Sequence, residues 1–428
     1  MDEGLESRLI IHNIIKLTLI KSYNQDQSLI ISTKNKKISI NNKRFIYNAS
    51  LTSIRQYFLI KKIIYNLVKK IDENSDTFIL LLSAITQISF LKIKEYAVVN
   101  STVELCDFKK IKAPKNLINA CLRNYLRNKS IYNNYCTEFI DFPKWFLSNT
   151  KNITKKQKEL FVNNISKHPT LHIVLKKKAN IKNYINYGKA TSKKSIGIHE
   201  KYNFNDIPNF KKGEWWVQDF SAMLPLNLIS IKKFDNIADV CSAPGGKLFQ
   251  ILCDNKKVSS YENDKKRLLK LNKNLKRLNY NLILKNSDFF YINKNKKFDL
   301  IVLDAPCSAV GTIRRNPDIL IKKNFPNLKY LTQVQKEFLD KSKLILKKNG
   351  ILIYMVCSFL EIETVNQIES FLDENRNFSI LPFSPEKNNI AKDFIDKKGF
   401  INTLPKSILK DIMVDGFFAA KLIKNYEI

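Results

Sequence analysis

Two cysteines stand directly behind two apolar stretches of strand length. The run Phe298–Asp304 is followed by Ala-Pro-Cys307, and the run Gly350–Val356 is followed by Cys357. Because parallel strands of one sheet end at the same edge, we expect both thiols to face one cleft together with Asp304. A free cysteine is more often a small, buried apolar side chain. Two strand-end thiols beside an acid instead indicate nucleophilic chemistry.

A second group of residues suits an adenosine-bearing ligand. The loop Cys241-Ser-Ala-Pro-Gly-Gly-Lys247 joins a predicted strand to a helix, and its glycines let the backbone approach a ligand closely. Glu262 ends the next predicted strand, about 20 positions on, where nucleotide-binding sheets place the acid for the ribose hydroxyls. Asp288 follows the third strand and would reach the adenine amino group. Since the loop matches neither a nicotinamide fingerprint nor a P-loop, methyl transfer from S-adenosylmethionine remains.

A parallel sheet must hold these residues, and the C-terminal part of the chain has the pattern of one. Strand-length apolar runs alternate there with helical segments, which predicts a doubly wound α/β sheet over residues 231–428. Leucines that share one face from Asp264 to Asn279 predict an amphipathic crossover helix. The expected strands are Ile237–Val240, Val258–Tyr261, Leu282–Leu284, Leu300–Leu303 and Ile351–Val356.

The rest of the chain divides into two further regions. Residues 1–135 contain almost no glycine or proline, and their apolar residues recur at helical spacing, so we expect an all-α domain. Residues 136–230 are punctuated by prolines and contain short apolar runs such as Leu171–Leu175. This pattern indicates a small α+β middle region.

The charge of the chain favours a nucleic-acid partner. Its 428 residues include 73 Lys and Arg against 39 Asp and Glu, a net charge of +34, and such a field attracts polyanions. Arg314 and Arg315 follow the Cys307 loop and could hold RNA phosphates close to the reacting base. A pair of surface arginines is as often inert, so this assignment is open at the level of the sequence.

Cysteine and histidine usage indicates a reducing compartment without a metal site. The seven cysteines form no CxxC pair, and the four histidines have no metal-ligand spacing, so we expect a cytoplasmic location and no metal. The longest apolar run, Thr77–Leu91, is too short and too polar to span a bilayer. We therefore expect no membrane association.

Four motifs together resemble the bacterial RNA cytosine-5 methyltransferases. They are CSAPGGK at 241–247, DAPCSAVGTIRRNPDI at 304–319, VCS at 356–358 and DGFFAAKL at 415–422. Weaker similarity runs through residues 217–222 and through residues 96–105 and 116–124, the last two resembling the helical, NusB-like N-terminal domain of that family. The family commonly has Asp and Thr at two positions where this chain has Glu262 and Val356.

The resemblance implies a Rossmann-like sheet of seven strands and an RNA-binding role for the helical domain of residues 1–135. It also assigns roles to the residues above. Cys357 would be the nucleophile that adds to carbon 6 of cytosine, and Cys307 would assist product release. Asp304 would contact ring N3 and draw off the charge that develops as sulfur adds. S-adenosylmethionine would be bound by Cys241, Ser242, Ala243, Pro244, Gly245, Gly246, Lys247, Glu262, Asp288 and Asp304.

We therefore expect a monomeric enzyme that methylates carbon 5 of one cytidine in small-subunit (16S) ribosomal RNA. The same chemistry on transfer RNA is the nearest alternative, because it requires the same catalytic residues. A second alternative is an RNA-binding ribosome assembly factor that has kept the fold without catalysis. The intact Asp304, Cys307 and Cys357 argue against that alternative.

Overall fold

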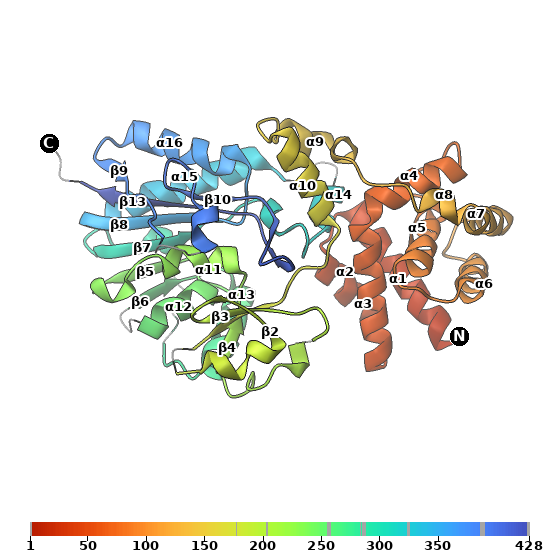
Figure 1. The fold of residues 1–428 in the computed structure, drawn as a ribbon, viewed down its shortest axis with the longest axis horizontal. Helices are drawn as coiled ribbons and strands as arrows, with labels where there is room; N and C mark the ends of the chain where they lie inside the picture. Colours follow the sequence, from red (N-terminus) through yellow and green to blue (C-terminus); the bar gives the residue numbers. More distant parts are fainter. Residues whose placement is uncertain are drawn as a thin grey trace. The chain divides into compact units, whose positions relative to one another are not determined.

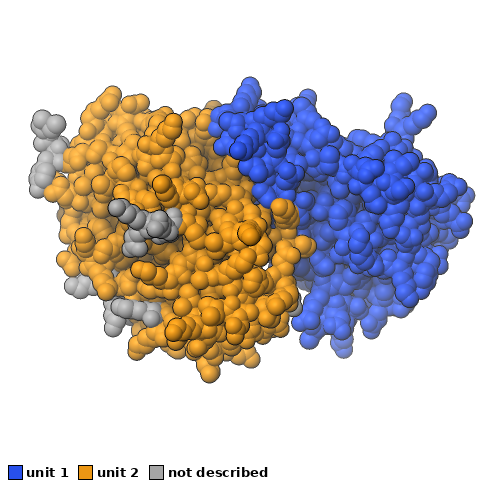
Figure 2. All heavy atoms as spheres, viewed as in Figure 1, with its two compact units in different colours: residues 1–166, 313–326 blue, residues 167–312, 327–428 orange. Residues whose placement is uncertain are grey.

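The chain forms two compact units, which Figure 2 colours separately. The computed structural model describes residues 2–176, 178–202, 204–254, 258–282, 284, 288–322, 326–385 and 390–425. Unit 1 comprises residues 1–166 and 313–326, and unit 2 comprises residues 167–312 and 327–428. The segment directly after the Cys307 loop thus belongs to unit 1. The division into three regions with boundaries near 135 and 230 stays a prediction.

Unit 1 is built from helices, which confirms the all-α expectation for the N-terminal domain. Polar residues begin several of them: the side chains of Asn24, Ser39 and Ser75 accept hydrogen bonds from the first-turn N–H groups. The helices, shown in Figure 1, are α1 (Glu3–Lys21), α2 (Gln25–Thr33), α3 (Ile40–Arg55), α4 (Tyr57–Leu67), α5 (Asp76–Ser89), α6 (Glu95–Leu105), α7 (Lys115–Arg127), α8 (Lys129–Tyr132), α9 (Lys144–Ser148), α10 (Lys155–Ile165) and α14 (Asp318–Ile321).

Helix α5 accounts for the longest apolar run of the sequence. Every residue from Asp76 to Ile88 is buried, so the helix is the centre of the unit 1 core. A helix that is apolar on all sides needs such surroundings. Among the residues described, no helix combines the length and hydropathy needed to cross a membrane.

Unit 2 contains a small antiparallel sheet ahead of the large one. Its strands are β1 (His172–Leu175), β2 (Gly188–Ser192), β3 (Ser195–Ile198) and β4 (Trp215–Val217), in the order β2-β3-β1-β4. The apolar run Leu171–Leu175 forms β1, in the middle of the sheet, and Trp215 is buried in its core with Tyr184. The middle region is therefore mixed, with α9 and α10 in unit 1 and these strands in unit 2.

The large sheet has seven strands in the order β10-β13-β8-β7-β5-β6, with β9 paired to β13. Pairing is parallel from β6 through β8 and antiparallel around β13, so the Rossmann-like prediction is confirmed. The strands are β5 (Ile237–Val240), β6 (Val258–Tyr261), β7 (Phe298–Asp304), β8 (Leu346–Val356), β9 (Phe378–Ile380), β10 (Ile401–Thr403) and β13 (Phe417–Lys424); β11 (Lys406–Ile408) and β12 (Ile412–Val414) form a separate hairpin.

Helices cover both faces of this sheet (Figure 1). In β7, Leu300 and Val302 pack in the core that contains α11 (Phe220–Asn227), α12 (Gly246–Asp254) and α13 (Lys265–Arg277). Ile301 and Leu303 point the other way, into the core with α15 (Leu328–Ile345) and α16 (Val365–Glu374). This alternation explains why β7 is apolar throughout.

Four of the five expected strands are present, and the expected helix at 264–279 is α13, capped by Asp264. The fifth, over residues 282–284, lies partly outside the described residues, and Leu282 and Leu284 themselves are not in a strand. The chain passes from β5 outward to β6 and then returns to β7 on the other side of β5. Ligands bind at such a switch point in open α/β sheets.

A buried carboxylic acid lies inside the central strand β5. Asp239 is 1% exposed, and neither of its carboxylate oxygens accepts a hydrogen bond from the described residues. Burial raises the pKa of Asp239 to about 7, and the charge of the nearby Asp304 acts in the same direction. The folded protein therefore keeps a proton that the unfolded chain releases near pH 4.

We expect this proton to make the stability of the fold depend on pH. A raised pKa favours folding most below the unfolded pKa, and that contribution is lost as the pH rises through about 7. Asp239→Asn should remove a pH dependence on the order of 4 kcal/mol between pH 4 and 7. Urea unfolding at a series of pH values measures it, with the exposed Asp235→Asn as control. The same slope in wild type and Asp239→Asn would contradict the assignment.

Candidate active site

The candidate site lies where β5, β7 and β8 end. Parallel pairing aligns Leu303 with Tyr354 and Asp304 with Met355, so the chain leaves β7 and β8 at the same level. The segment behind β7 then leads to Cys307, and the residue behind β8 is Cys357. The sheet therefore brings the two predicted thiols to one edge, next to Asp304.

The two sulfur atoms are in hydrogen-bonding contact. Cys307 Sγ and Cys357 Sγ are 3.4 Å apart, and both residues are partly exposed free cysteines. The hydrogen bond with Cys357, together with burial and the nearby Glu363 carboxylate, raises the pKa of Cys307 well above its usual value. Cys307 thus keeps its proton and can donate it in a hydrogen bond to the sulfur of Cys357.

A buried carboxylate connects the two thiol-bearing loops. Glu363 is 0% exposed, and its Oε1 accepts hydrogen bonds from Ser308 N at 2.8 Å and from Gln335 Nε2 at 3.2 Å. Its Oε2 accepts from the hydroxyl of Ser308 and from Ser358 Oγ, the latter at 2.6 Å. Ser308 and Ser358 directly follow the two cysteines in the sequence. Glu363 therefore fixes the loops at the positions next to the thiols.

Close backbone packing also fixes the loop behind β7. Gly311 N donates to the carbonyl of Cys357 at 2.9 Å, and Gly416 N donates to the carbonyl of Gly311 at 2.9 Å. A Cβ atom on Gly311 would lie 1.9 Å from the Gly416 carbonyl oxygen. Only glycine fits at this position, so the DGFFAAKL motif that contains Gly416 helps to shape the site.

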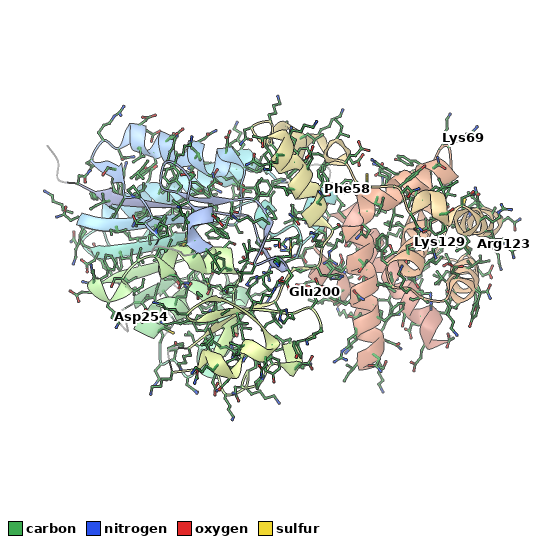
Figure 3. The ribbon with its side chains drawn as sticks, in the orientation of Figure 1. Phe58, Lys69, Arg123, Lys129, Glu200 and Asp254 are labelled. Atoms are coloured by element: carbon green, nitrogen blue, oxygen red, sulfur yellow. The ribbon has the colours of Figure 1, made fainter. Side chains whose placement is uncertain are left out.

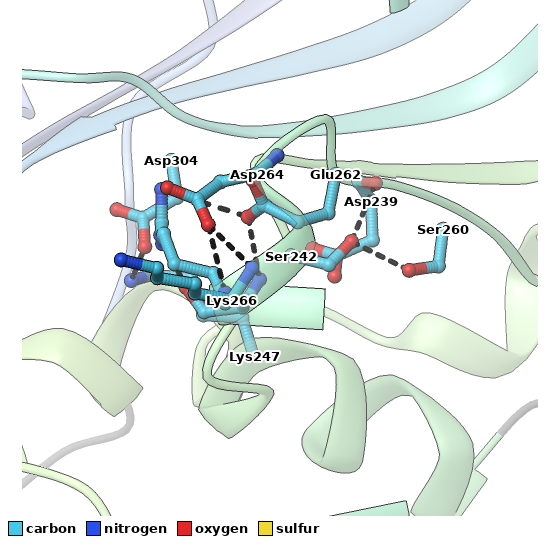
Figure 4. Close-up of polar contacts among 10 residues, drawn as sticks. Asp239, Ser242, Lys247, Ser260, Glu262, Asp264, Lys266 and Asp304 are labelled. Atoms are coloured by element: carbon cyan, nitrogen blue, oxygen red, sulfur yellow. Dashed lines mark hydrogen bonds and ion pairs between the residues drawn. The ribbon is translucent and has the colours of Figure 1, made fainter. Parts of the chain in front are cut away.

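Lys247 lies against Asp304 rather than free at the sheet edge. Its Nζ is 2.6 Å from Asp304 Oδ2 (Figure 4). The same Nζ is 5.4 Å from the centre of the Phe417 ring. The lysine side chain is mostly buried, whereas a third of the Asp304 side chain is exposed. The ion pair holds one carboxylate oxygen and leaves Oδ1, which accepts no hydrogen bond from the described residues.

The glycine loop is tied to the acid at the end of β6. Glu262 Oε2 accepts from Ala243 N at 3.3 Å, Glu262 Oε1 accepts from Asp264 N at 3.1 Å, and Arg267 donates to the Ala243 carbonyl (Figure 4). Gly245 has φ +116°, and a Cβ there would come within 2.1 Å of the Phe249 ring. The loop conformation therefore requires glycine at this position.

The residues around this loop fit S-adenosylmethionine. Cys241, Glu262 and Asp288 line one hollow, together with the aromatic side chains Phe289 and Phe338. Carboxylates that accept from ribose hydroxyls and an adenine amino group, beside flat apolar walls, are the groups that an adenosyl ligand needs. Burial raises the pKa of Cys241, so this third thiol stays protonated and is no competitor to the pair behind β7 and β8.

Other predicted site residues lie away from this edge. Ser242 is buried. Its hydroxyl donates to the carbonyl of Asp239 at 2.9 Å and accepts from Ser260 at 2.8 Å (Figure 4). These hydrogen bonds hold the loop against β5 and β6. Arg314 is 0% exposed within unit 1, and Arg315 is partly exposed. The structure therefore differs from the expected clamp of two surface arginines, because the Arg314 side chain is not at the surface.

Sequence reasoning missed Glu363. It stands six positions behind Cys357, in a polar turn that carries no recognisable motif by itself. The available signal was the pair of serines behind the two thiols, whose hydroxyls need an acceptor when buried. No group of three or more His, Cys, Asp or Glu side chains suited to a metal occurs among the described residues.

Comparison with known proteins agrees with this arrangement. Residues 226–423 match the model of the family described as 16S rRNA methyltransferase RsmB/F, and residues 7–127 match the NusB family. Ribosomal RNA small subunit methyltransferase B of Vibrio vulnificus is 31% identical over 81% of this chain and 82% of its own length. The enzyme of that name from Photorhabdus laumondii is 30% identical, over 81% and 82%. The crystal structure of PH0851 matches 99% of both chains with 20% identity and a TM-score of 0.69, so it shares the fold.

The matches cover both the helical N-terminal part and the sheet that carries the thiols. Relatives at this level of identity extend over most of the chain and most of their own length. The chain therefore belongs to the RsmB/F family of rRNA methyltransferases, and S-adenosylmethionine is its cofactor.

Proposed function

We propose that the protein methylates carbon 5 of one cytidine in 16S ribosomal RNA through a covalent bond between Cys357 and the base. The observation that carries this proposal is the sulfur pair, 3.4 Å apart, at the sheet edge next to Asp304. A methyltransferase that acts on a nitrogen or a hydroxyl group needs no nucleophilic thiol. It also needs no second thiol in contact with the first. The family description and the names of the relatives support the ribosomal RNA target.

The thiol is needed because carbon 5 of cytosine is a poor nucleophile. Addition of the Cys357 thiolate to carbon 6 moves the electron pair of the ring double bond and makes carbon 5 electron-rich. Cys307, which keeps its proton, stabilises that thiolate before attack by donating a hydrogen bond to it. Bound S-adenosylmethionine supplies the electrophilic methyl group. The target base must first leave its stack, at a cost of a few kcal/mol.

Asp304 and Lys247 would balance the charge on the ring. As sulfur adds to carbon 6, negative charge develops toward ring N3, and Asp304 can relay a proton from the Lys247 ammonium to N3. Lys247 is then neutral, and Asp304 keeps its negative charge. When the ring is restored, the proton returns from N3 through Asp304 to Lys247.

Release requires a second proton transfer. The proton on carbon 5 must leave so that its electron pair can reform the double bond and expel Cys357 as a thiolate. A water that Cys307 positions is the group that we assign to this removal, because the sulfur of Cys307 contacts that of Cys357 while Cys307 itself keeps its proton. The two thiols thus act at opposite ends of one reaction.

Single replacements of the two cysteines test these roles. With S-adenosylmethionine and RNA, Cys307→Ala should accumulate a covalent RNA–protein complex that survives denaturing gel electrophoresis, because release fails after attack. Cys357→Ala should form none, because no sulfur can attack. The buried Cys121→Ala serves as a control with wild-type behaviour. The opposite phenotypes would show that the roles are reversed.

Glu363→Gln tests whether thiol placement depends on the buried carboxylate. The amide offers one acceptor oxygen in place of two, so the hydrogen bonds from Ser308 and Ser358 cannot all be kept. We expect adduct formation to slow on the order of 10²-fold, as for a reacting group displaced by about 1 Å. Affinity for S-adenosylmethionine should stay unchanged, because Glu363 does not line the cofactor hollow.

The exposed Glu374→Gln on α16 is the matched control for Glu363→Gln. A wild-type rate of adduct formation in folded Glu363→Gln would contradict the positioning role. A parallel loss of cofactor affinity would indicate general damage to the fold instead.

Bisulfite sequencing of total RNA identifies the target. Cells that contain the protein should show one cytidine of 16S ribosomal RNA that resists conversion, and cells without it should show none. Cells that carry Cys357→Ala should behave as those without the protein, which separates catalysis from a role in assembly. Resistance that appears in transfer RNA instead would move the proposal to that substrate, and no change in any RNA would refute cytosine-5 methylation.

A further inference from the structure

Unit 1 contains a pocket that none of the chemistry above uses. Its volume is about 350 Å³, and all of its lining residues belong to unit 1: the end of α3, the start of α4, residues 135–142, the end of α10 and residues 313–320. The walls are largely apolar and aromatic, with Phe58, Phe90, Tyr135 and Phe142; Phe58 is labelled in Figure 3. A pocket of this size and lining fits a small flat group.

One charged side chain lines this pocket. Arg55 is 8% exposed, and its Nη2 donates to the carbonyl of Arg314 at 3.2 Å. Its Nε and Nη1 find no acceptor among the described residues. No Asp or Glu is among the lining residues. Two donors of a buried cation are therefore without an acceptor.

The surroundings of Arg55 make this cation costly. Burial lowers the pKa of Arg55 to about 10, and the neighbouring Arg314 charge acts in the same direction, partly opposed by Tyr47. A buried charge without a partner is unfavourable, and an anion that brings acceptor oxygens relieves that cost. Charge-assisted hydrogen bonds from arginine to phosphate are among the stronger ones in proteins.

We propose that this pocket binds one nucleotide of the RNA substrate, with a phosphate on Arg55 and the base against the aromatic wall. The proposal rests on the proposed function for the identity of the ligand as RNA. A carboxylate would satisfy Arg55 equally, but it leaves the aromatic surface without a partner, whereas a nucleotide occupies both. The pocket holds RNA at a point on unit 1 while the thiols act from unit 2.

Equilibrium binding of the full chain to RNA tests the Arg55 contact. Arg55→Met should weaken binding about tenfold, the loss expected for one charged hydrogen-bonded contact. The slope of log affinity against log salt should fall by about 0.7, the value for one phosphate of a single strand. The exposed Arg123→Met on α7, labelled in Figure 3, removes the same charge outside the pocket and should leave both quantities nearly unchanged.

A second variant distinguishes loss of the RNA contact from misfolding caused by a change at the buried Arg55. Asn163 is exposed and lines the pocket, so Asn163→Asp adds a negative charge there without removing packing. It should weaken RNA binding as Arg55→Met does, whereas Asn116→Asp, at an exposed position of α7 outside the pocket, should not. Wild-type affinity and salt slope in both Asn163→Asp and folded Arg55→Met would overturn the proposal.

Crosslinking locates the base, and methylation separates this proposal from the preceding one. RNA containing 4-thiouridine should crosslink, under ultraviolet light, to the peptide around Tyr135 in wild type and lose that crosslink in Asn163→Asp. Its absence in wild type would refute a base in the pocket. If the protein methylates carbon 5 of cytosine but neither variant weakens RNA binding, the proposed function holds and the proposed nucleotide site is refuted. If the variants weaken RNA binding but the protein methylates no cytosine, the nucleotide site holds and the proposed function is refuted.

Discussion

The parallel pairing of β7 with β8 is the constraint on which the active site depends. Because Asp304 lies level with Met355, the two chains leave the sheet side by side, and each delivers a cysteine to the same edge. The backbone then fixes their separation: Gly311 donates to the carbonyl of Cys357 and is packed too closely against Gly416 for any side chain. Backbone hydrogen bonds thus place the loops that carry the two thiols.

Electrostatics then favours the protonated form of Cys307. The hydrogen bond with the sulfur of Cys357, burial and the nearby Glu363 carboxylate raise the pKa of Cys307. Burial also raises the pKa of Cys241, but its sulfur has no thiol partner in the described hydrogen bonds. Three cysteines therefore follow three parallel strands of one sheet, and only the two behind β7 and β8 form a pair.

The parts of this structure that could be predicted depend on local patterns. Apolar runs of strand length identified β5, β6, β7 and β8, and a leucine stripe identified α13, because burial on fixed faces imposes those periods. The site residues behind the strands followed from the rule that parallel strands end together. Glu363 could not be predicted, because its hydrogen bonds with Ser308 join segments 55 positions apart in the sequence. The burial of Arg314 could not be predicted either, because its segment leaves the sheet and belongs to the helical unit.

Two buried charged side chains, Glu363 and Arg55, differ in whether their hydrogen bonds are all made. This difference separates a structural role from a binding role. Glu363 accepts from a backbone N–H, two hydroxyls and an amide, so no acceptor capacity remains for a ligand and the group serves to fix loops. Arg55 donates to one carbonyl, and its Nε and Nη1 have no acceptor among the described residues, beside a pocket whose lining contains no acidic side chain. A buried ion whose hydrogen bonds are all made makes its surroundings more rigid. A buried ion that lacks hydrogen-bond partners can gain free energy only when a ligand supplies them. In a chain with a net charge of +34, whose family acts on RNA, the partner that reaches Arg55 is an anion of that polymer.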